Sequence, residues 1–519
     1  MKQLLIMILT ICLFSPIHSQ NKYDYIWHTG YSYFRGPAPT YAPLYGFQIN
    51  FNNGKTRIDT MKRTYDFVET VQSTCDSNGN FLFSSNGCQI FNKNFEVMDN
   101  GDSLNNVPTS TFSNSCLVTS SKAEIVHNGA LSLPIPDSKD SLFAFFRTEI
   151  NKVLVGQQNL LPLNLYYSVI NMKANNGLGK VTLKNQIIVR DTFDGGDINA
   201  TKHANGKDWW IITRKFISNK FYTFKVSANG LDSSFTQLVG EPTLARSQGG
   251  GDAFFSPNGI KYAYFTAINQ LMLYDFDRAS GKLSNFRRII IPYESVSDVF
   301  FSGLSFSPNS KYLYIFAVKQ IFQVDTDAND IQSNVLEVAK YDTLAARFAF
   351  PTGGRLAPDC KIYFTSTNGL QYFGYIRYPD RKGVACQVMQ GAIKTPFTTA
   401  IRSGLPNNPN YRLGVTPTHP CDSTIDFRVS TKEMYTKIDV NVFPNPSTGN
   451  VTLDWDEGVN TEGGIVRVVN MFGQMVFQQR LPSNETRAQL ELNVPSGVYQ
   501  ILLNFKENKV FQGKVLIVK

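Results

Sequence analysis

An all-β fold with at least two domains is predicted by three features of the sequence. Turns rich in Asn, Asp, Gly or Ser recur between about residues 65 and 415, each followed by an aromatic-rich apolar strand. A stretch of small residues precedes each of the last four turns, and the last eighty or so residues form a separate series of short alternating strands. A chain of 519 residues also exceeds one ordinary hydrophobic core.

The recurring unit has a simple physical basis. Asn-Gly supplies the positive φ angles that a tight hairpin needs, and aromatic residues alternating with small ones suit a strand between two packed sheets. The units are Asn78–Phe83, Asp140–Phe145, Asn205–Trp210, Asn258–Tyr264, Asn309–Tyr314 and Asp359–Phe364. Because one such sheet cannot bury both faces alone, the units must stack, and radial stacking gives a β-propeller.

The small-residue stretches suit the innermost strand of each blade, where neighbouring blades crowd the axis. They are Asp197–Thr201, Gly250–Ala253, Ser302–Ser305 and Gly353–Leu356. Phe255–Gly259 and Phe306–Ser310 are near-copies of one motif, which resembles the strand–turn motif of WD-repeat-like propellers.

Six or seven blades are expected, with seven favoured. Strands near Tyr25–Trp27 and Gly46–Phe51 are expected to complete a last blade with strands after residue 390 and so close the ring. The long interval from 138 to 205 predicts a surface insertion in the second blade.

Residues 1–19 are predicted to be a signal peptide. Lys2 gives the positive start, 4–14 is the apolar stretch, and Ser19 suits cleavage before Gln20. The apolar stretch is shorter than the roughly 20 residues of a membrane span, and no transmembrane segment is expected later in the chain. The predicted domains are a β-propeller over 20–421, a polar linker over 422–438 and a C-terminal module over 439–519.

The C-terminal module is predicted to be a small immunoglobulin-like β-sandwich, because short alternating strands follow one another at close intervals. The expected strands are Val451–Trp455, Gly464–Asn470, Gln474–Gln479, Ala488–Leu492, Gly497–Asn504 and Lys509–Val518.

The order of Val440–Pro446, Phe472-Gly473, Pro495–Tyr499 and Gly513–Lys519 resembles the type A C-terminal sorting domain of the type IX secretion system of Bacteroidota. The resemblance implies recognition by the secretion translocon, removal of the domain by a sortase-like protease and frequent attachment to anionic lipopolysaccharide. It implies a secreted or outer-membrane cell-surface protein that travels through the periplasm. The sorting residues carried over are Pro444, Asn445, Pro446, Gly449, Gly473, Gly497, Tyr499 and Lys514.

The preceding part of the chain resembles the large propeller proteins that Bacteroidota attach to such a tail. Cys75–Phe83, Lys202–Trp210, Leu356–Tyr363 and Asn410–Gly414 carry this resemblance. It implies a cell-surface β-propeller but no particular reaction.

Disulfides are expected, because an exported chain meets an oxidising compartment and six cysteines remain after the signal peptide, which contains Cys12. The favoured pairs are Cys75–Cys88 and Cys360–Cys386, since each brackets one hairpin-sized stretch, and Cys116–Cys421 follows by elimination. No Cys-x-x-Cys motif occurs, so neither a metal site nor a cofactor is predicted.

The formal charge of +9 is spread without any long Lys/Arg run. A nucleic-acid surface would need a basic stripe with interleaved aromatic residues, so nucleic acid is not an expected partner. Weak attraction to anionic lipopolysaccharide or glycans fits the same charge.

No catalytic residue is assigned, because serine-hydrolase, metalloprotease and nucleotide-binding motifs are absent from the sequence. The candidates are Asp197, Asp252 and His203. The two carboxylates, near predicted inner strands, suit either glycoside hydrolysis across an axial funnel or bonds to backbone amides of neighbouring blades. His203 suits either a bond to its adjacent turn or a catalytic base.

The leading hypothesis is an exported cell-surface β-propeller that binds a protein or glycan partner without catalysis. The alternatives are a polysaccharide hydrolase or lyase with axial carboxylates, and a structural or adhesion component of the cell surface. Aromatic residues in a Gly- and Pro-rich early stretch suit stacking on a ligand or capping of the propeller: Tyr31, Tyr33, Phe34, Tyr41 and Tyr45.

Deleting residues 438–519 should leave the propeller in the periplasm, because the predicted sorting signal is then lost. Fractionation and surface labelling of cells that produce the truncated chain check this. Normal surface display of the truncated chain would contradict the sorting role.

Overall fold

The computed structural model describes residues 21–32, 44–63, 65–105, 116, 123–124, 126–153, 160–193, 195, 198–242, 251–266, 270–293, 302–317, 319–340, 351–366, 372–395, 399–400, 404–426, 436–456, 464–470, 475–481, 485–504 and 509–519. The predicted signal peptide, 1–19, lies outside them. The chain divides into two compact units, residues 1–431 and 432–519, which are taken separately below.

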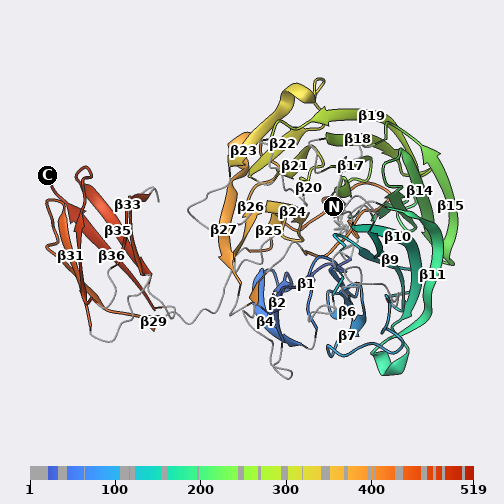
Figure 1. Ribbon diagram of the computed structural model, residues 1–519, viewed down its shortest axis with the longest axis horizontal. Coiled ribbons are helices and arrows are strands. Elements are labelled where there is room, and N and C mark those ends of the chain that lie inside the picture. Colours follow the sequence, from blue (N-terminus) through green and yellow to red (C-terminus); the bar gives the residue numbers. More distant parts are fainter. Residues whose placement is uncertain are drawn as a thin grey trace, which may run out of the picture. The chain divides into compact units, whose positions relative to one another are not determined.

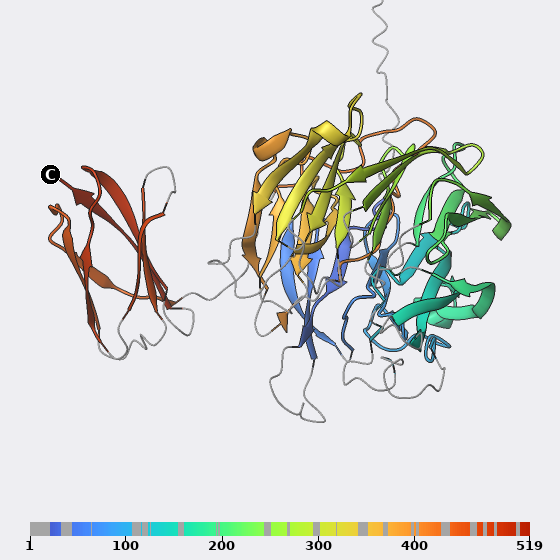
Figure 2. The same ribbon diagram turned by 45° about the horizontal axis from the view of Figure 1, so that its top comes forward.

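The first unit is a β-propeller, as predicted. Its described residues form seven antiparallel sheets of three or four strands around one axis, with β20 and β24 near the centre and β11, β15 and β19 at the rim (Figure 1). The tilted view shows the blades side by side around the ring (Figure 2).

The blades, numbered in chain order, are as follows. Blade 1 has β1 (Ile26–Thr29), β3 (Leu44–Asn50) and β4 (Arg57–Arg63); blade 2 has β5 (Gln72–Cys75), β6 (Phe81–Ser85) and β7 (Ile90–Asn92); blade 3 has β8 (Ala130–Pro134), β9 (Leu142–Val153), β10 (Leu160–Asn171) and β11 (Lys180–Thr192); blade 4 has β12 (Asn199–Lys202), β13 (Trp209–Arg214), β14 (Lys220–Ser227) and β15 (Gly230–Leu238). Blade 5 has β16 (Asp252–Phe255), β17 (Lys261–Phe265), β18 (Gln270–Asp277) and β19 (Lys282–Ile290); blade 6 has β20 (Gly303–Phe306), β21 (Tyr312–Ala317), β22 (Gln320–Asp325) and β23 (Val335–Lys340); blade 7 has β24 (Pro351–Leu356), β25 (Ile362–Ser366), β26 (Tyr372–Ile376) and β27 (Val388–Lys394).

Aromatic side chains fill the space between blades, which explains their abundance in the sequence. Between blades 4 and 5, Trp210 and Phe221 share one buried cluster with Tyr262, Tyr274 and Phe276. Burying one such side chain stabilises the folded state by about 2 kcal/mol. Each blade therefore depends on its neighbours for the burial of both of its faces.

Ring closure differs from the prediction. The N-terminal strands β1, β3 and β4 form a blade by themselves, whereas the strands after residue 390 were expected to share it. The ends of the propeller meet instead where β2 (Tyr31–Ser32) pairs with β28 (Thr399–Ala400). The prediction of a surface insertion after residue 138 is also wrong. The residues of this long interval form the long blade strands β9, β10 and β11, which have 12, 12 and 13 residues.

Side chains join neighbouring inner strands around the axis. Ser73 Oγ of blade 2 donates to Ile26 O of blade 1 at 2.6 Å, and Gln72 Nε2 donates to Ser132 Oγ of blade 3 at 2.8 Å. Asn199 Oδ1 of blade 4 accepts from Phe255 N of blade 5 at 3.1 Å. The small and polar residues of the inner strands thus satisfy backbone groups that no sheet ladder reaches.

The centre of the ring is occupied by the chain itself. Residues 404–421, here called the axial segment, follow blade 7 and bond to inner strands of several other blades. Asn407 Nδ2 donates to Ala130 O at 3.2 Å and Ile198 O at 2.9 Å, and Tyr411 Oη donates to Ser132 O at 2.9 Å. Further along, Asn410 Nδ2 donates to Pro257 O at 2.8 Å.

The two disulfides are Cys88–Cys116 and Cys360–Cys421, so the favoured pairs were wrong. Cys75 pairs with Phe81 across the β5–β6 hairpin, while Cys88 lies beyond the opposite end of β6. Cys360 lies in the turn after the innermost strand of blade 7, but Cys386 lies in the turn before its outermost strand. Cys75 and Cys386 are buried free thiols, and burial raises the pKa of both.

The second unit is a sandwich of two sheets, as predicted. One sheet has the order β29-β36-β35-β32-β33 and the other β30-β31-β34. Alternate residues of the strands, such as Val466, Val468, Ile501 and Leu503, are buried between the sheets. The strands are β29 (Thr436–Lys437), β30 (Val440–Phe443), β31 (Asn450–Trp455), β32 (Ile465–Val469), β33 (Met475–Arg480), β34 (Arg487–Glu491), β35 (Gly497–Asn504) and β36 (Lys509–Ile517).

Replacing both Cys360 and Cys421 with Ser should lower the free energy of unfolding by roughly 4 kcal/mol, because the disulfide closes a long loop in the unfolded chain. The loop spans 61 residues and holds the axial segment to blade 7. Urea denaturation followed by circular dichroism measures the change. Dithiothreitol should destabilise the wild-type chain, but it should not change the stability of a variant that lacks both disulfides. Equal stability of the wild type and the variant with Ser at positions 360 and 421 would contradict the assigned disulfide.

Candidate functional site

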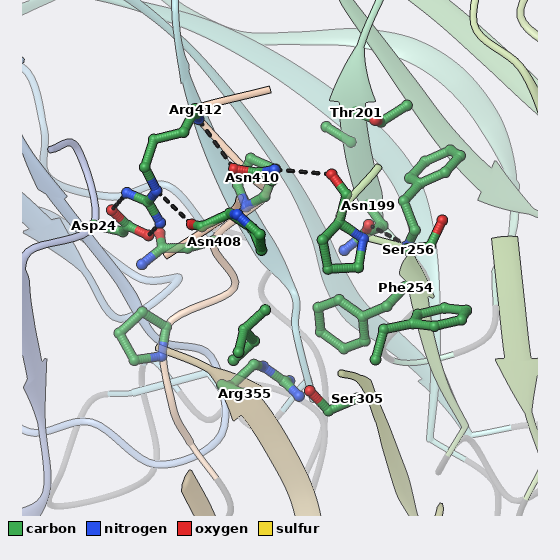
Figure 3. Close-up of a pocket in the computed structure, with 18 of the residues that line it drawn as sticks. Asp24, Asn199, Thr201, Phe254, Ser256, Ser305, Arg355, Asn408, Asn410 and Arg412 are labelled. Atoms are coloured by element: carbon green, nitrogen blue, oxygen red, sulfur yellow. Dashed lines mark hydrogen bonds and ion pairs between the residues drawn. The ribbon is translucent and has the colours of Figure 1, made fainter. Parts of the chain in front are cut away.

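The candidate site is a cavity of about 60 Å³ beside the axial segment (Figure 3). It is lined by inner-strand residues of blades 1 and 4 to 7 and by residues of the axial segment. Blades 2 and 3 contribute no lining residue among those described, because the axial segment packs directly on them: Asn408 bonds to Gln72 of blade 2, and Asn407 and Tyr411 bond to β8 of blade 3. The cavity is thus the part of the channel that the segment leaves unfilled.

The lining combines aromatic side chains with amides and hydroxyls. Trp27, Phe254, Phe255 and Phe306 supply the aromatic surface. The polar residues are Asp24, Asn199, Thr201, Ser256, Ser305, Arg355, Asn408, Asn410 and Arg412.

On one side of the cavity, Asp24 and Arg412 face each other (Figure 3). Arg412 Nη1 and Nη2 donate to the two carboxylate oxygens of Asp24 at 2.6 and 2.7 Å, and both side chains are buried. Burial alone would lower the pKa of Arg412, but Asp24 raises it above its ordinary value. This bidentate pair joins the N-terminal end of the propeller to the axial segment.

On the other side, Arg355 of β24 extends the site into a buried polar cluster. Its Nη1 donates to Asp252 Oδ2 at 3.2 Å, its Nη2 donates to Asn128 Oδ1, and its guanidinium carbon lies 4.4 Å from the centre of the Phe254 ring. Burial lowers the pKa of Arg355, and Asp252 opposes that change.

Asp252 accepts bonds from several directions. Asn128 Nδ2 donates to its Oδ1 at 2.5 Å, and Leu304 N of blade 6 donates to its Oδ2 at 3.3 Å. His127 Nε2 lies 3.7 Å from Oδ2. The carboxylate is fully buried and joins blades 5, 6 and 7. Its bond to Leu304 N is of the kind expected if Asp252 binds backbone amides of neighbouring blades.

Three N–H groups of the lining have no hydrogen-bond partner among the described residues. They are Trp27 Nε1, Arg355 Nε and Asn408 Nδ2. Asn408 Oδ1 accepts from Gln72 Nε2 at 3.2 Å, and this bond gives the amide its orientation. All three groups are donors only.

Of the other two catalytic candidates, His203 is not among the described residues that line this cavity. His203 lies at the turn before β13, where its Nδ1 accepts from Asn205 N at 3.0 Å and its ring packs near Trp210. Asp197 lies outside the described residues. Tyr33, Phe34 and Tyr41 also lie outside them, and only the backbone of Tyr31 and Tyr45 is described.

Sequence reasoning missed Trp27, Arg355, Asn408 and Arg412 as site residues. Arg355 falls in a stretch that was recognised as an inner strand, and its charge among small residues was the available signal. Nothing in the sequence indicates that residues after blade 7 return to the axis. Asn408 and Arg412 therefore had no signal that could place them there.

Two groups of side chains have ligand atoms close enough for a metal ion: Cys360, His419 and Cys421, and Cys88, Cys116 and Glu124. Each group contains a disulfide pair, whose sulfurs carry no thiolate. Metal ligation by cysteine requires the thiolate, so both groups are structural in this oxidised chain.

In the second unit, the proposed sorting residues organise the edge of the sandwich. Asn445, between Pro444 and Pro446, donates through Nδ2 to Lys514 O at 2.9 Å and accepts from Leu516 N at 2.9 Å. Tyr499 Oη donates to Pro495 O at 2.9 Å.

Two glycines of this set are described. Gly449 has φ of +130°, and an added Cβ would lie 2.8 Å from Leu492 O, so a side chain is excluded there. Gly497 begins β35, and Gly473 lies outside the described residues.

Comparison with known proteins identifies the second unit. Residues 441–519 match the family described as the secretion system C-terminal sorting domain. An ulvan lyase of Nonlabens ulvanivorans is 30% identical over 78 residues, which cover 15% of this chain and 14% of the lyase. The second unit is therefore a type IX sorting domain, and the chain is exported to the cell surface or secreted.

Solved structures similar to this chain include several at low identity. PorZ, a surface component of the type IX secretion system of Porphyromonas gingivalis, is 10% identical with a TM-score of 0.27, covering 92% of this chain and 69% of PorZ. The periplasmic gluconolactonase PpgL of Pseudomonas aeruginosa is 9% identical with a TM-score of 0.37, covering 73% of this chain and 98% of PpgL. No described helix is long and apolar enough to cross a membrane.

Replacing Asp24 with Asn should lower the free energy of unfolding by about 3–5 kcal/mol, because Arg412 is then left buried without its counter-ion. Asp99→Asn is the matched control, since Asp99 pairs with Lys180 at 3.0 Å on the surface and its loss should cost at most about 1 kcal/mol. Denaturant titration of both variants measures the difference, and equal effects would contradict the structural role of the Asp24–Arg412 pair.

Proposed function

We propose that the protein is a cell-surface β-propeller that binds a protein or glycan partner on the face where the axial segment emerges, without catalysis. Export is given by the sorting domain. The proposal rests on the state of the carboxylates in and beside the axial cavity.

Among the described residues, the carboxylates in and beside the cavity are those of Asp24 and Asp252, and both are committed to structural bonds. Asp24 holds Arg412 through both oxygens, and Asp252 holds Arg355, Asn128 and a backbone N–H of the next blade. A glycosidase needs one carboxyl group to donate a proton and a second to act as nucleophile or base. Freeing either group here would leave an arginine buried without its partner, which favours binding over hydrolysis.

The face at the end of the axial segment offers apolar contact surface. Val415 is 68% exposed and Ile260 is 47% exposed. Val415 lies against Gly206 in the first turn of blade 4, and Leu413 lies against Gly259, the neighbour of Ile260, in the corresponding turn of blade 5. Exposed apolar side chains that a scaffold holds in place are a common basis for partner binding.

The fate of the sorting domain forms part of the same proposal. The translocon recognises the domain, a sortase-like protease removes it, and the propeller is then attached to anionic lipopolysaccharide. The formal charge of +9 supports an association with an anionic surface.

Two alternatives remain as competing hypotheses. The first alternative, polysaccharide cleavage, is suggested by the name of the ulvan lyase. That match spans 78 residues, so it does not extend to most of this chain. A structural or adhesion role at the cell surface would use the same exposed face without a soluble ligand.

A glycan and surface-protein binding array with the full chain tests the proposal. We expect binding to a defined partner, and Val415→Asp should weaken it at least about tenfold because a charge replaces an apolar contact. Leu238→Asp is the matched control: Leu238 is 72% exposed but lies at the end of β15 opposite the turn that joins it to β14.

Turnover of a polysaccharide by the wild-type chain would overturn the non-catalytic assignment. Equal loss of binding in the Leu238→Asp control would overturn the assignment of the face. The two variants should have the same thermal stability, which circular dichroism checks.

A further inference from the structure

The axial cavity has three N–H groups without a hydrogen-bond partner among the described residues, and the fold of the propeller does not require this. Trp27 is 1% exposed and Arg355 is 4% exposed, so neither Trp27 Nε1 nor Arg355 Nε can rely on bulk water. A buried donor without a partner destabilises the fold, and this cavity holds two such donors together with Asn408 Nδ2. The cost is removed when an acceptor occupies the cavity.

The tryptophans show that Trp27 is exceptional. The sequence contains four tryptophans. The indole N–H groups of Trp209, Trp210 and Trp455 donate to the carbonyl oxygens of Pro134, Arg278 and Glu485 at 3.1, 2.8 and 3.1 Å. Only Trp27, which lines the cavity, has no such acceptor among the described residues.

The carboxylate and amide oxygens of the lining already accept hydrogen bonds. Both oxygens of Asp24 accept from Arg412, Asn199 Oδ1 accepts from Phe255 N, and Asn408 Oδ1 accepts from Gln72 Nε2. The buried side-chain atoms of the lining that lack a partner among the described residues are therefore all donors. A group that only accepts hydrogen bonds fits this pattern, and an ionised carboxylate is such a group.

Arg355 offers an anion a cationic partner on its side of the cavity. Arg355 meets Asp252 with a single described N–O contact of 3.2 Å, and that carboxylate also serves Asn128 and Leu304 N. Arg412, in contrast, is fully neutralised by a two-point pair. A second anion beside Arg355 would share its charge without displacing Asp252.

We propose that the axial cavity binds the carboxylate of a small organic acid or of an acidic sugar, held by Trp27, Arg355 and Asn408. The axial cavity is a second ligand site, separate from the exposed face around Val415, and its occupation does not depend on the partner proposed for that face. A cavity of about 60 Å³ admits the carboxylate and the carbon that carries it. The aromatic side chains of Phe254 and Phe306 line the same cavity and offer contact to the apolar part of the ligand.

Acetate and acetamide, which share size and shape but differ in charge, are the first probes. In a ¹⁵N-labelled full chain, each tryptophan gives one indole N–H signal, and Trp27→Phe identifies the signal of Trp27. We expect acetate to shift that signal in a saturable way while the other three stay in place. Acetamide should leave all four signals unchanged.

Variants then test the donors through saturation-transfer NMR on acetate itself. Trp27→Phe keeps an aromatic ring at this position but removes the indole N–H donor, so acetate affinity should fall about tenfold. Asn408→Asp places a carboxylate in the cavity and should abolish acetate binding. Trp209→Phe is the control, because Trp209 is not part of the lining and its removal should leave acetate affinity unchanged.

Several outcomes would overturn the proposal: no shift of the Trp27 signal, equal shifts with acetamide, or unchanged affinity in Trp27→Phe. Should Asn408→Asp fail to fold, Trp27→Phe alone decides. Glucuronate and glucose separate the two ligand sources: a Trp27 shift with glucuronate alone admits an acidic sugar, and a shift with acetate alone restricts the site to small acids. The array and the acetate titration are independent, so failure of one does not imply failure of the other.

Discussion

The inner edge of the ring is the constraint on which the propeller depends. Each blade ends at the axis in a strand whose outward side is paired within its sheet and whose other side is not. Those unpaired carbonyl groups need donors, and water has little room to reach them there. The axial segment supplies the donors for three blades through Asn407, Tyr411 and Asn410.

Filling the axis with the chain's own residues changes what the channel can do. On the side of blades 2 and 3 the axial segment fills the channel, whereas on the opposite side it leaves a small cavity lined partly by aromatic side chains. The two buried ion pairs, Asp24–Arg412 and Asp252–Arg355, fix the segment and the neighbouring inner strands. Because these charges hold the architecture, freeing either carboxylate for proton transfer would leave an arginine buried without its partner.

The second unit follows a different logic. Its sandwich has its own buried core, and its sorting residues form turns and edge contacts, such as the two hydrogen bonds between Asn445 and the backbone of β36. Export therefore depends on a structural unit that has its own hydrophobic core.

The sequence by itself determined the strands, the repeat and the sorting domain, because these depend on neighbours within a few residues. Asn-Gly turns and alternating aromatic residues fix hairpins locally, and all six expected strands of 451–518 correspond to strands of the sandwich. Only the tertiary structure decided the cysteine pairs, the closure of the ring and the path of residues 404–421. These depend on contacts between residues from 28 positions apart, as in Cys88–Cys116, to 388 positions apart, as in Asp24 with Arg412, and no local pattern in the sequence records which distant residues meet.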